Sequence, residues 1–185
     1  TEALAAAMGD LSPDRQPLLL LALVDRTDAA VLPAVIKAAK TGKKELRIAA
    51  IGVLPRIGNV SCVPVLLDAA AENDAELSQA AKTTLTKLPG KDVDPDLLTR
   101  LPQATGKTRQ VLVELAGARQ IAGAIPAVVS SIQDADAGVR GAAVQTLGVL
   151  GGLEQVPDLV TLAQKTQNAS ERGDIEKALL AVSGR

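Results

Sequence analysis

Hydrophobic positions recur along this chain with the spacing of helices. In the stretch KKELRIAAIGVLPRIG, one helical face collects Leu46, Ala49, Ala50, Val53 and Leu54. After a break at Gly58-Asn59, the stretch VPVLLDAA forms a second apolar stripe from Val63, Leu66, Leu67 and Ala70. No segment alternates with the period of a strand over any length. The pattern predicts an all-α chain made of two kinds of short helix.

Two columns of residues repeat with one common period. Prolines lie 31 residues apart, at Pro33, Pro64, Pro95, Pro126 and Pro157. A second column with the same step holds Arg47, Ser78, Arg109 and Arg140, and Arg15 and Arg172 extend it with one extra residue each. We call the helix with the arginine column the first helix of a repeat and the helix with the proline the second helix. Since neither helix buries its stripe alone, the repeats must stack into an α-solenoid.

The periodicity sets approximate boundaries for twelve helices. First helices are expected at about 12–25, 43–56, 75–88, 106–118, 137–150 and 170–182. Second helices are expected at about 1–9, 29–41, 61–72, 95–102, 124–133 and 154–166. Residues 1–9 then lack a first helix and residues 170–185 lack a second. We therefore expect a single array over residues 1–185, with about five helix pairs and a half repeat at each end. We also expect this array to be a segment of a longer protein.

Capping and breaking residues agree with these boundaries. Pro64 suits the first turn of a second helix, where no N–H is needed. Asp74 and Asp136 are expected to cap first helices, and Asp28 a second helix. Left-handed glycines are expected in the breaks between helices, at Gly90, Gly123 and Gly151. First helices are expected to bend or end near one shared position, at Pro55, Gly117 and Gly148.

The phrase DADAGVRGAAVQTLGVLGGLEQVPDLV resembles the HEAT-repeat family, in particular the short bacterial HEAT-like repeats of the PBS-lyase type. The matching residues are Pro126, Asp134, Val139 and Arg140. The resemblance implies a right-handed α-α superhelix whose second helices line the concave face.

The chain departs from the family in two respects. The family joins neighbouring repeats by an aspartate–arginine ladder, but here the aspartate position reads Thr41, Glu72, Gln103, Asp134 and Lys165, and Ser78 interrupts the arginines. We expect the ladder to be mostly lost. In residues 88–106, Asp94 replaces an apolar residue and Pro102 ends a second helix early, so the weakest stacking and the most mobile backbone are expected there.

Composition excludes several kinds of chemistry. The 185 residues include no Phe, Trp, Tyr or His, and the net charge is −1. Imidazole catalysis and imidazole metal ligation are absent, as are aromatic platforms for bases. A neutral chain lacks the field of a phosphate-backbone binder. The single cysteine, Cys62, is expected to be a buried thiol.

Carboxylates and serines add no catalytic site. The groups Asp92/Asp94/Asp96 and Asp134/Asp136 lack the glycine and terminal glutamate of a calcium loop. Gly151-Gly152 is a turn, and no GxxxxGK[ST] motif occurs. The serines have no base to activate them. We predict no catalytic residue, no metal ligand and no cofactor.

Two overlapping surfaces are candidates for partner binding. Positions four residues after each proline form a polar row on the second helices: Lys37, Asp68, Thr99, Ser130 and Thr161. A basic cluster contains Lys37, Lys40, Lys43, Lys44 and Arg47, and it suits an acidic loop or a phosphate. Each set is also compatible with an ordinary solvated surface.

These features predict a non-catalytic protein–protein interaction or scaffolding module within a larger bacterial protein. The partner is expected to be a protein or peptide, with no nucleic acid and no membrane insertion. The alternatives are a HEAT-like lyase-type or nucleic-acid-binding protein, or a passive spacer between domains. Partner identity, localisation and oligomeric state are not defined by the sequence.

Overall fold

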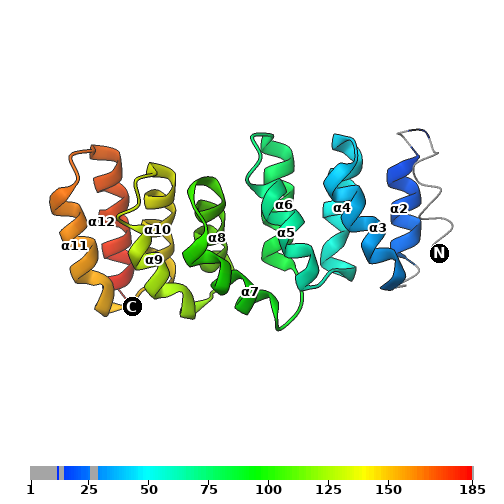
Figure 1. Ribbon diagram of the computed structural model, residues 1–185. Coiled ribbons are helices and arrows are strands. Elements are labelled where there is room, and N and C mark those ends of the chain that lie inside the picture. The colour runs from blue at the N-terminus through cyan, green and yellow to red at the C-terminus, as the bar shows by residue number, and fades with distance from the viewer. Residues whose placement is uncertain (1–11, 13–14, 26–28, 185) are drawn as a thin grey trace. The chain divides into compact units, whose positions relative to one another are not determined.

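The computed structural model describes residues 12, 15–25 and 29–184, and its regular elements are all helical (Figure 1). The α-helices are α2 (Gln16–Val24), α3 (Leu32–Thr41), α4 (Lys44–Ile57), α5 (Val63–Ala70), α6 (Ala75–Lys87), α7 (Val93–Arg100), α8 (Gly106–Ala118), α9 (Ile125–Ser131), α10 (Ala137–Leu150), α11 (Val156–Lys165) and α12 (Ala169–Ser183). Short 3₁₀ turns are η2 (Ala29–Val31), η3 (Val60–Cys62), η4 (Leu101–Gln103), η5 (Ala122–Ala124) and η6 (Leu153–Gln155). The all-α prediction is confirmed.

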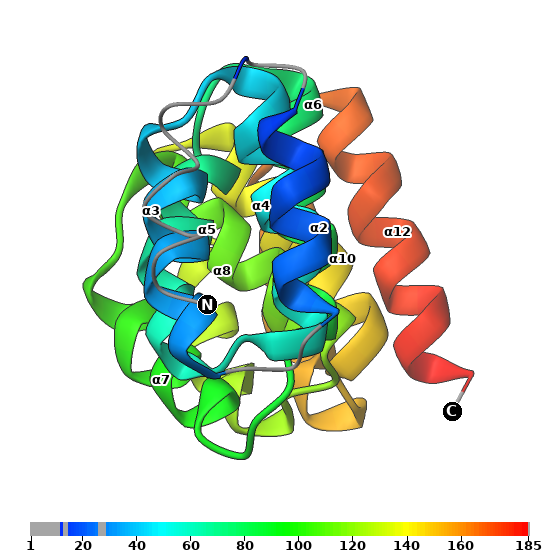
Figure 2. The same cartoon turned by 90° about the vertical axis from the view of Figure 1, so that its right-hand side faces the viewer.

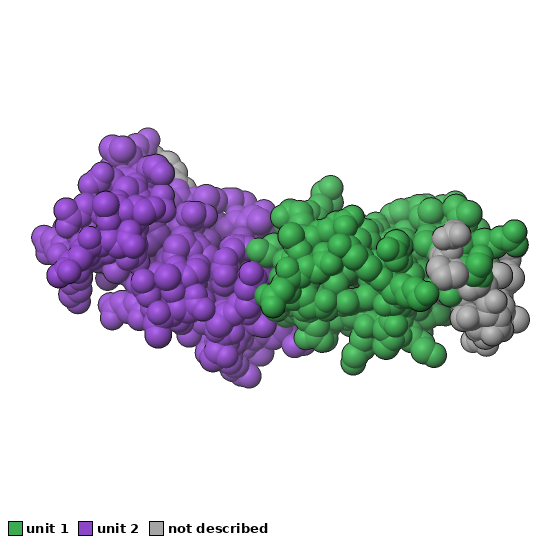
Figure 3. Space-filling view, turned by 90° about the horizontal axis from the view of Figure 1, so that it is seen from above, with its two compact units in different colours: residues 1–93 green, residues 94–185 purple. Residues whose placement is uncertain are grey.

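The chain divides into two compact units, Thr1–Val93 (unit 1) and Asp94–Arg185 (unit 2), which are coloured separately in Figure 3. In unit 1 the first helices α2, α4 and α6 stack as one layer, and the second helices α3 and α5 pack on α4 and α6 (Figure 2). In unit 2, α8, α10 and α12 stack in turn, while α9 packs on α10 and α11 on α12. Each of these second helices thus packs on the first helix that follows it, as in an α-solenoid. Continuity of one array over residues 1–185 stays a prediction.

Helix boundaries follow the 31-residue period closely. The predicted first helices 106–118 and 137–150 coincide with α8 and α10. The predicted second helices at 29–41, 61–72, 124–133 and 154–166 each divide into a 3₁₀ turn and an α-helix. α7 ends at Arg100 and gives way to η4, which contains Pro102. α9 ends at the equivalent residue, Ser131, so an early end caused by Pro102 stays a prediction. The half repeat at 1–9 and the cap at Asp28 lie outside the described residues.

Side-chain caps were predicted correctly for two first helices. The Asp74 carboxylate accepts the backbone N–H groups of Glu76 and Leu77, each over 3.1 Å. Asp136 accepts in the same way from Gly138 over 2.7 Å and from Val139 over 3.4 Å. These bonds satisfy N–H groups that a helix start otherwise leaves unpaired.

The prediction of left-handed glycines holds at one of three positions. Gly90 has a φ of +121°, but Gly151 is extended with a φ of −68°, and Gly123 lies inside η5. After α8 the left-handed residue is Gln120, with a φ of +58°. Its backbone N–H and side-chain amide both donate to the Gly117 carbonyl, so local hydrogen bonds compensate for this conformation.

Aliphatic side chains make up the buried interior, as the absence of aromatics requires. Ile51, Leu54, Leu66, Leu85, Leu112 and Leu147 are among the fully buried large residues. Alanines such as Ala39, Ala50, Ala81 and Ala143 are fully buried between them, where they let helices approach closely. Cys62 is also fully buried and free, so the buried-thiol prediction is confirmed.

A side chain from the next repeat compensates for the hydrogen bond that Pro55 removes from α4. A proline has no N–H, so in α4 it leaves the Ile51 carbonyl without its helical donor. The Thr84 hydroxyl on α6 donates to that carbonyl over 3.1 Å, and both residues are buried. α4 then ends at Ile57, two residues after the proline. The predicted end of this helix near Pro55 is therefore confirmed, and a hydroxyl bond compensates for it.

The same contact recurs in unit 2 with a glycine in place of the proline. Thr146 on α10 donates to the Val113 carbonyl on α8 over 3.0 Å. A Cβ at Gly117 would lie 3.2 Å from the Thr146 hydroxyl oxygen, so the missing side chain makes room for this bond. One repeat later, a Cβ at Gly148 would lie 3.3 Å from the Ala178 Cα on α12. This column thus permits close approach of neighbouring first helices.

Candidate functional site

The polar row is exposed on all five second helices in the described part of the chain. In unit 1 it contains Lys37 on α3 and Asp68 on α5. In unit 2 it contains Thr99 on α7, Ser130 on α9 and Thr161 on α11. The three hydroxyls donate to carbonyls of their own helices, at Pro95, Ala127 and Pro157, over 2.7 to 2.9 Å. To an external ligand they therefore offer mainly acceptor oxygens.

The basic cluster is not one continuous solvated surface, because two of its five cations contact the next repeat. Arg47 donates to both carboxylate oxygens of Glu72, and its Nε donates to the Ala39 carbonyl over 2.9 Å. The Lys44 ammonium lies 2.8 Å from Asp74 and 3.0 Å from Glu76. The interpretation of this cluster as five available cations is therefore wrong for Lys44 and Arg47.

Acid–base properties follow these contacts. The hydrogen bond from Arg47 lowers the pKa of Glu72. The carboxylates of Asp74 and Glu76 raise the pKa of Lys44, whereas the Lys44 ammonium lowers the pKa of Asp74. Each member of these pairs holds its partner in the charged form. The pairs act between repeats and leave little of their charge for a ligand.

Lys37, Lys40 and Lys43 have a different environment. Lys37 and Lys40 lie three residues apart in the last two turns of α3, and Lys43 precedes α4. All three are exposed. Among the described residues, none of their ammonium groups has an ion-pair or hydrogen-bond partner. The uncompensated positive charge of this segment is thus concentrated on these three residues, which we call the basic patch.

The ladder between repeats is retained in altered form, so its predicted loss is wrong. Arg109 lies 3.4 Å from the Asp134 carboxylate, the same sequence offset as Arg47 to Glu72. Where Lys165 occupies the aspartate position, Arg140 bonds to Glu171 over 2.8 Å instead. Hydrogen bonds from Arg140 and Thr166 lower the pKa of Glu171.

Ser78 also keeps part of the role of the arginine column. Its hydroxyl donates over 2.6 Å to the carbonyl of Ala70, eight residues before it, at the end of α5. Arg47 contacts the carbonyl of Ala39, also eight residues before it, in the last turn of α3. Both side chains satisfy a carbonyl near the C-terminal end of the preceding second helix.

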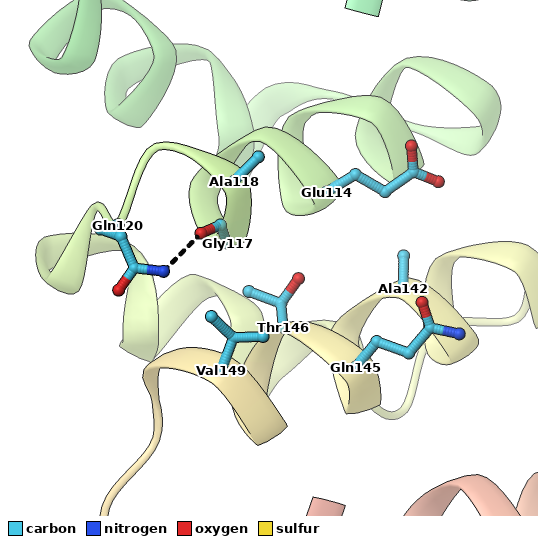
Figure 4. Close-up of a pocket in the computed structure, with 8 residues that line it drawn as sticks. All are labelled: Glu114, Gly117, Ala118, Gln120, Ala142, Gln145, Thr146 and Val149. Atoms are coloured by element: carbon cyan, nitrogen blue, oxygen red, sulfur yellow. Dashed lines mark hydrogen bonds between the residues drawn. The ribbon is translucent and has the colours of Figure 1, made fainter. Parts of the chain in front are cut away.

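Open grooves lie between neighbouring first helices, and none of the residues that line them was among the predicted binding residues. Between α8 and α10 a groove of about 360 Å³ has Gly117 and Ala118 on one side and Ala142, Thr146 and Val149 on the other (Figure 4). A related groove of about 430 Å³ separates α4 from α6 and includes Pro55 and Thr84. The sequence signal for both is the column of Pro55, Gly117 and Gly148, which by itself predicts only that helices bend or end there.

Three of the remaining candidate carboxylates, Asp94, Asp96 and Asp136, have structural partners. Asp94 bonds to Arg119, Asp96 to Arg100 over 2.6 Å, and Asp136 caps α10. Burial raises the pKa of the Cys62 thiol. Within the described ranges, no group of three or more acidic or cysteine side chains is arranged to hold a metal ion. No helix in the same ranges is long and apolar enough to span a membrane.

Comparisons with known proteins gave a family match and several similar solved structures. Residues 93–180 match the family of HEAT repeats. Among solved structures, an engineered protein from the Northeast Structural Genomics Consortium is 14% identical, with a TM-score of 0.48 and 99% of this chain and 96% of that chain covered. The complex of CpcE and CpcF of phycocyanin lyase from Nostoc sp. PCC7120 is 17% identical, with a TM-score of 0.48 and coverages of 98% and 94%. A designed armadillo repeat protein in complex with the peptide (KR)4 is 15% identical, with a TM-score of 0.48 and coverages of 97% and 98%. The search of curated proteins gave no match.

The family match confirms the resemblance drawn from the repeat phrase. The matched segment, residues 93–180, contains Pro126, Asp134, Val139 and Arg140, which carry that resemblance. Residues 33–71 carry the same proline and arginine columns in the same register, with Pro33, Arg47 and Pro64. The class of the protein is thus an all-α solenoid of HEAT-like repeats.

Proposed function

We propose that this chain is a non-catalytic protein-interaction module that binds its partner through the exposed face of its second helices. The observation that carries this proposal is the polar row of Lys37, Asp68, Thr99, Ser130 and Thr161. Each of the five second helices that the structure describes presents an exposed polar residue at this position. Within each unit, a row of this kind suits an extended or helical partner segment better than a small molecule, which needs a concave, largely apolar pocket.

The available chemistry supports binding rather than catalysis. The sequence contains no histidine, and its one thiol is buried with a raised pKa. The carboxylates of Glu72, Asp134 and Glu171 are engaged by arginines in contacts between repeats. These three carboxylates already stabilise the stack, and the sequence offers no imidazole as a general base.

Affinity capture from the source organism tests the proposal, with the whole chain as bait. One pair of double variants reverses or adds charge on second helices: Lys37→Glu/Lys40→Glu and Thr161→Glu/Gln164→Glu. A matched pair places the same kinds of change on first helices or just beyond them: Lys87→Glu/Lys91→Glu and Gln145→Glu/Ser183→Glu. All of these positions are exposed. Circular dichroism confirms that each variant is folded before it is used.

We expect saturable capture of a specific protein that at least one second-helix variant loses and both first-helix variants retain. Loss only in the first-helix variants would overturn the proposed surface and transfer binding to the grooves. No saturable capture by the wild-type chain would instead support a passive spacer. Recovery of nucleic acid would favour a nucleic-acid-binding protein, and turnover by the isolated chain would favour a lyase-type enzyme.

A further inference from the structure

The basic patch belongs to a single repeat. The equivalent positions in the other repeats are Asp68, Ala71 and Asp74; Thr99, Pro102 and Thr105; Ser130, Gln133 and Asp136; and Thr161, Gln164 and Gln167. None of them is a cation. Because the backbone positions are equivalent, the repeated architecture does not by itself require lysine at Lys37, Lys40 or Lys43.

Lys43 is also unfavourable for the helix that it precedes. It occupies the N-cap position of α4 in extended conformation and makes no side-chain cap. The equivalent residues Asp74 and Asp136 cap α6 and α10. A cation at this position opposes the helix dipole and leaves N–H groups of the first turn without a side-chain acceptor. A residue that weakens its own helix is expected where function rather than stability selects it.

Neighbouring charges define the direction from which a ligand fits. Lys44 and Arg47 are neutralised by Glu72, Asp74 and Glu76, so they add little to the field of the patch. Asp68, the exposed equivalent of Lys37 on the next second helix, bounds the patch on the α5 side. An anionic segment is therefore attracted along α3 toward Lys43 and repelled where it would cross onto α5.

We propose that the basic patch binds an acidic segment of a protein partner, aligned along α3 from Lys37 to Lys43. This inference rests on the proposed function, because it specifies the partner chemistry for one part of the second-helix face. Lysine ammonium groups on flexible stems accommodate carboxylates in several geometries. A single-stranded nucleic acid would gain only phosphate contacts here, because the chain has no aromatic side chain on which a base stacks.

Fluorescence anisotropy with a labelled oligoglutamate peptide tests this proposal on the whole chain at low ionic strength. We expect saturable binding to the wild-type chain and a weakening of about tenfold or more in Lys37→Glu/Lys40→Glu. The control Lys87→Glu/Lys91→Glu changes the net charge of the same unit equally. Its lysines are exposed and likewise without an ion-pair partner in the described chain, so binding should be nearly unchanged.

A third variant separates binding from folding. Lys43→Asp should weaken oligoglutamate binding while raising the midpoint of urea unfolding, because it removes a cation from the patch and adds a cap to α4. A variant that lost affinity through misfolding would show a lower midpoint. Retained affinity in Lys43→Asp would remove Lys43 from the patch and overturn the alignment along α3.

Three further outcomes overturn the acidic-partner proposal as a whole. The first is that oligoglutamate does not bind to the wild-type chain. The second is that Lys37→Glu/Lys40→Glu and the control lose affinity for oligoglutamate equally. The third is tighter binding of a labelled oligothymidylate with the same dependence on Lys37 and Lys40, which would reassign the patch to nucleic acid. If oligoglutamate fails while affinity capture still depends on second-helix positions, the interaction function stands and only the acidic partner is rejected.

Discussion

At the residue scale, the Thr84 hydroxyl replaces the backbone donor that Pro55 does not supply to the Ile51 carbonyl. Thr84→Val should leave the buried Ile51 carbonyl without a donor and cost about 1–3 kcal/mol of unfolding free energy. In a Pro55→Ala background the alanine N–H supplies that donor, so the cost of Thr84→Val should fall by about 1 kcal/mol or more. Urea unfolding of the four proteins measures the difference.

Thr146→Val provides the control for this cycle. The Val113 carbonyl has a helical donor at Gly117, so the loss of the Thr146 hydroxyl should cost less than the loss of Thr84. If Thr84→Val cost the same with and without Pro55, the hydroxyl would not be compensating for the proline.

Glu171 links its repeat to Arg140 and makes stability depend on pH. Its pKa is lowered in the folded chain, chiefly by the hydrogen bond from Arg140. Such a group contributes stability that is fully present above the unfolded pKa, which is about 4.3 for glutamate. This stability is lost as the pH falls through the lower pKa of the folded chain. The free energy of unfolding should therefore decline on acidification through this window.

Glu171→Gln should make this decline shallower, because glutamine does not titrate. Urea unfolding at a series of pH values, from neutral down to about pH 3, measures the two slopes. Identical slopes for the wild-type chain and the variant would show that the Arg140–Glu171 contact contributes nothing to the pH dependence.

At the scale of a single helix, α4 offers a direct test of capping. Lys43→Asp should stabilise the chain by about 0.5–2 kcal/mol, the range associated with a good N-cap. Asp74→Ala should destabilise it by a similar amount, because that residue already caps α6. Urea unfolding checks both signs. A destabilising Lys43→Asp would mean that Lys43 makes a contact important for the fold.

Two of the three glycines in α10 have opposite expected responses to alanine. Gly148→Ala would place a Cβ 3.3 Å from the Ala178 backbone and push α12 away, which should destabilise the chain by about 1–3 kcal/mol. At Gly141 a Cβ meets no atom within 4 Å, so Gly141→Ala should stabilise by about 0.5–1 kcal/mol. Thermal unfolding separates the two. Equal effects would contradict the close approach of α10 and α12.

For the molecule as a whole, the repeat could be predicted from the sequence because the signals that mark it are local. Proline at the start of second helices, aspartate at N-caps and apolar stripes at helical spacing depend on neighbours within a few residues. They placed the ends of α8 and α10 correctly and made Asp68, Ser130 and Thr161 candidates for an exposed row, which the structure places at the surface.

Contacts between repeats were less predictable, because they depend on how helices pack. Glu72 and Asp74 lie 25 and 30 residues after the cations that they neutralise, Arg47 and Lys44. The aspartate pattern alone counts Glu72 as a departure, although its carboxylate accepts two hydrogen bonds from Arg47. The grooves depend in the same way on how closely first helices approach at Gly117, which no local pattern reports.

Site-specific photo-cross-linking in the source organism tests the central claim of a second-helix binding face most directly. A benzophenone amino acid is placed at Asp68 or Ser130 on second helices, and at Thr83 or Gln145 on first helices of the same units; all four positions are exposed. We expect a discrete cross-linked protein from Asp68, Ser130 or both, and none from Thr83 or Gln145. Cross-links from the first-helix positions alone would contradict a second-helix binding face.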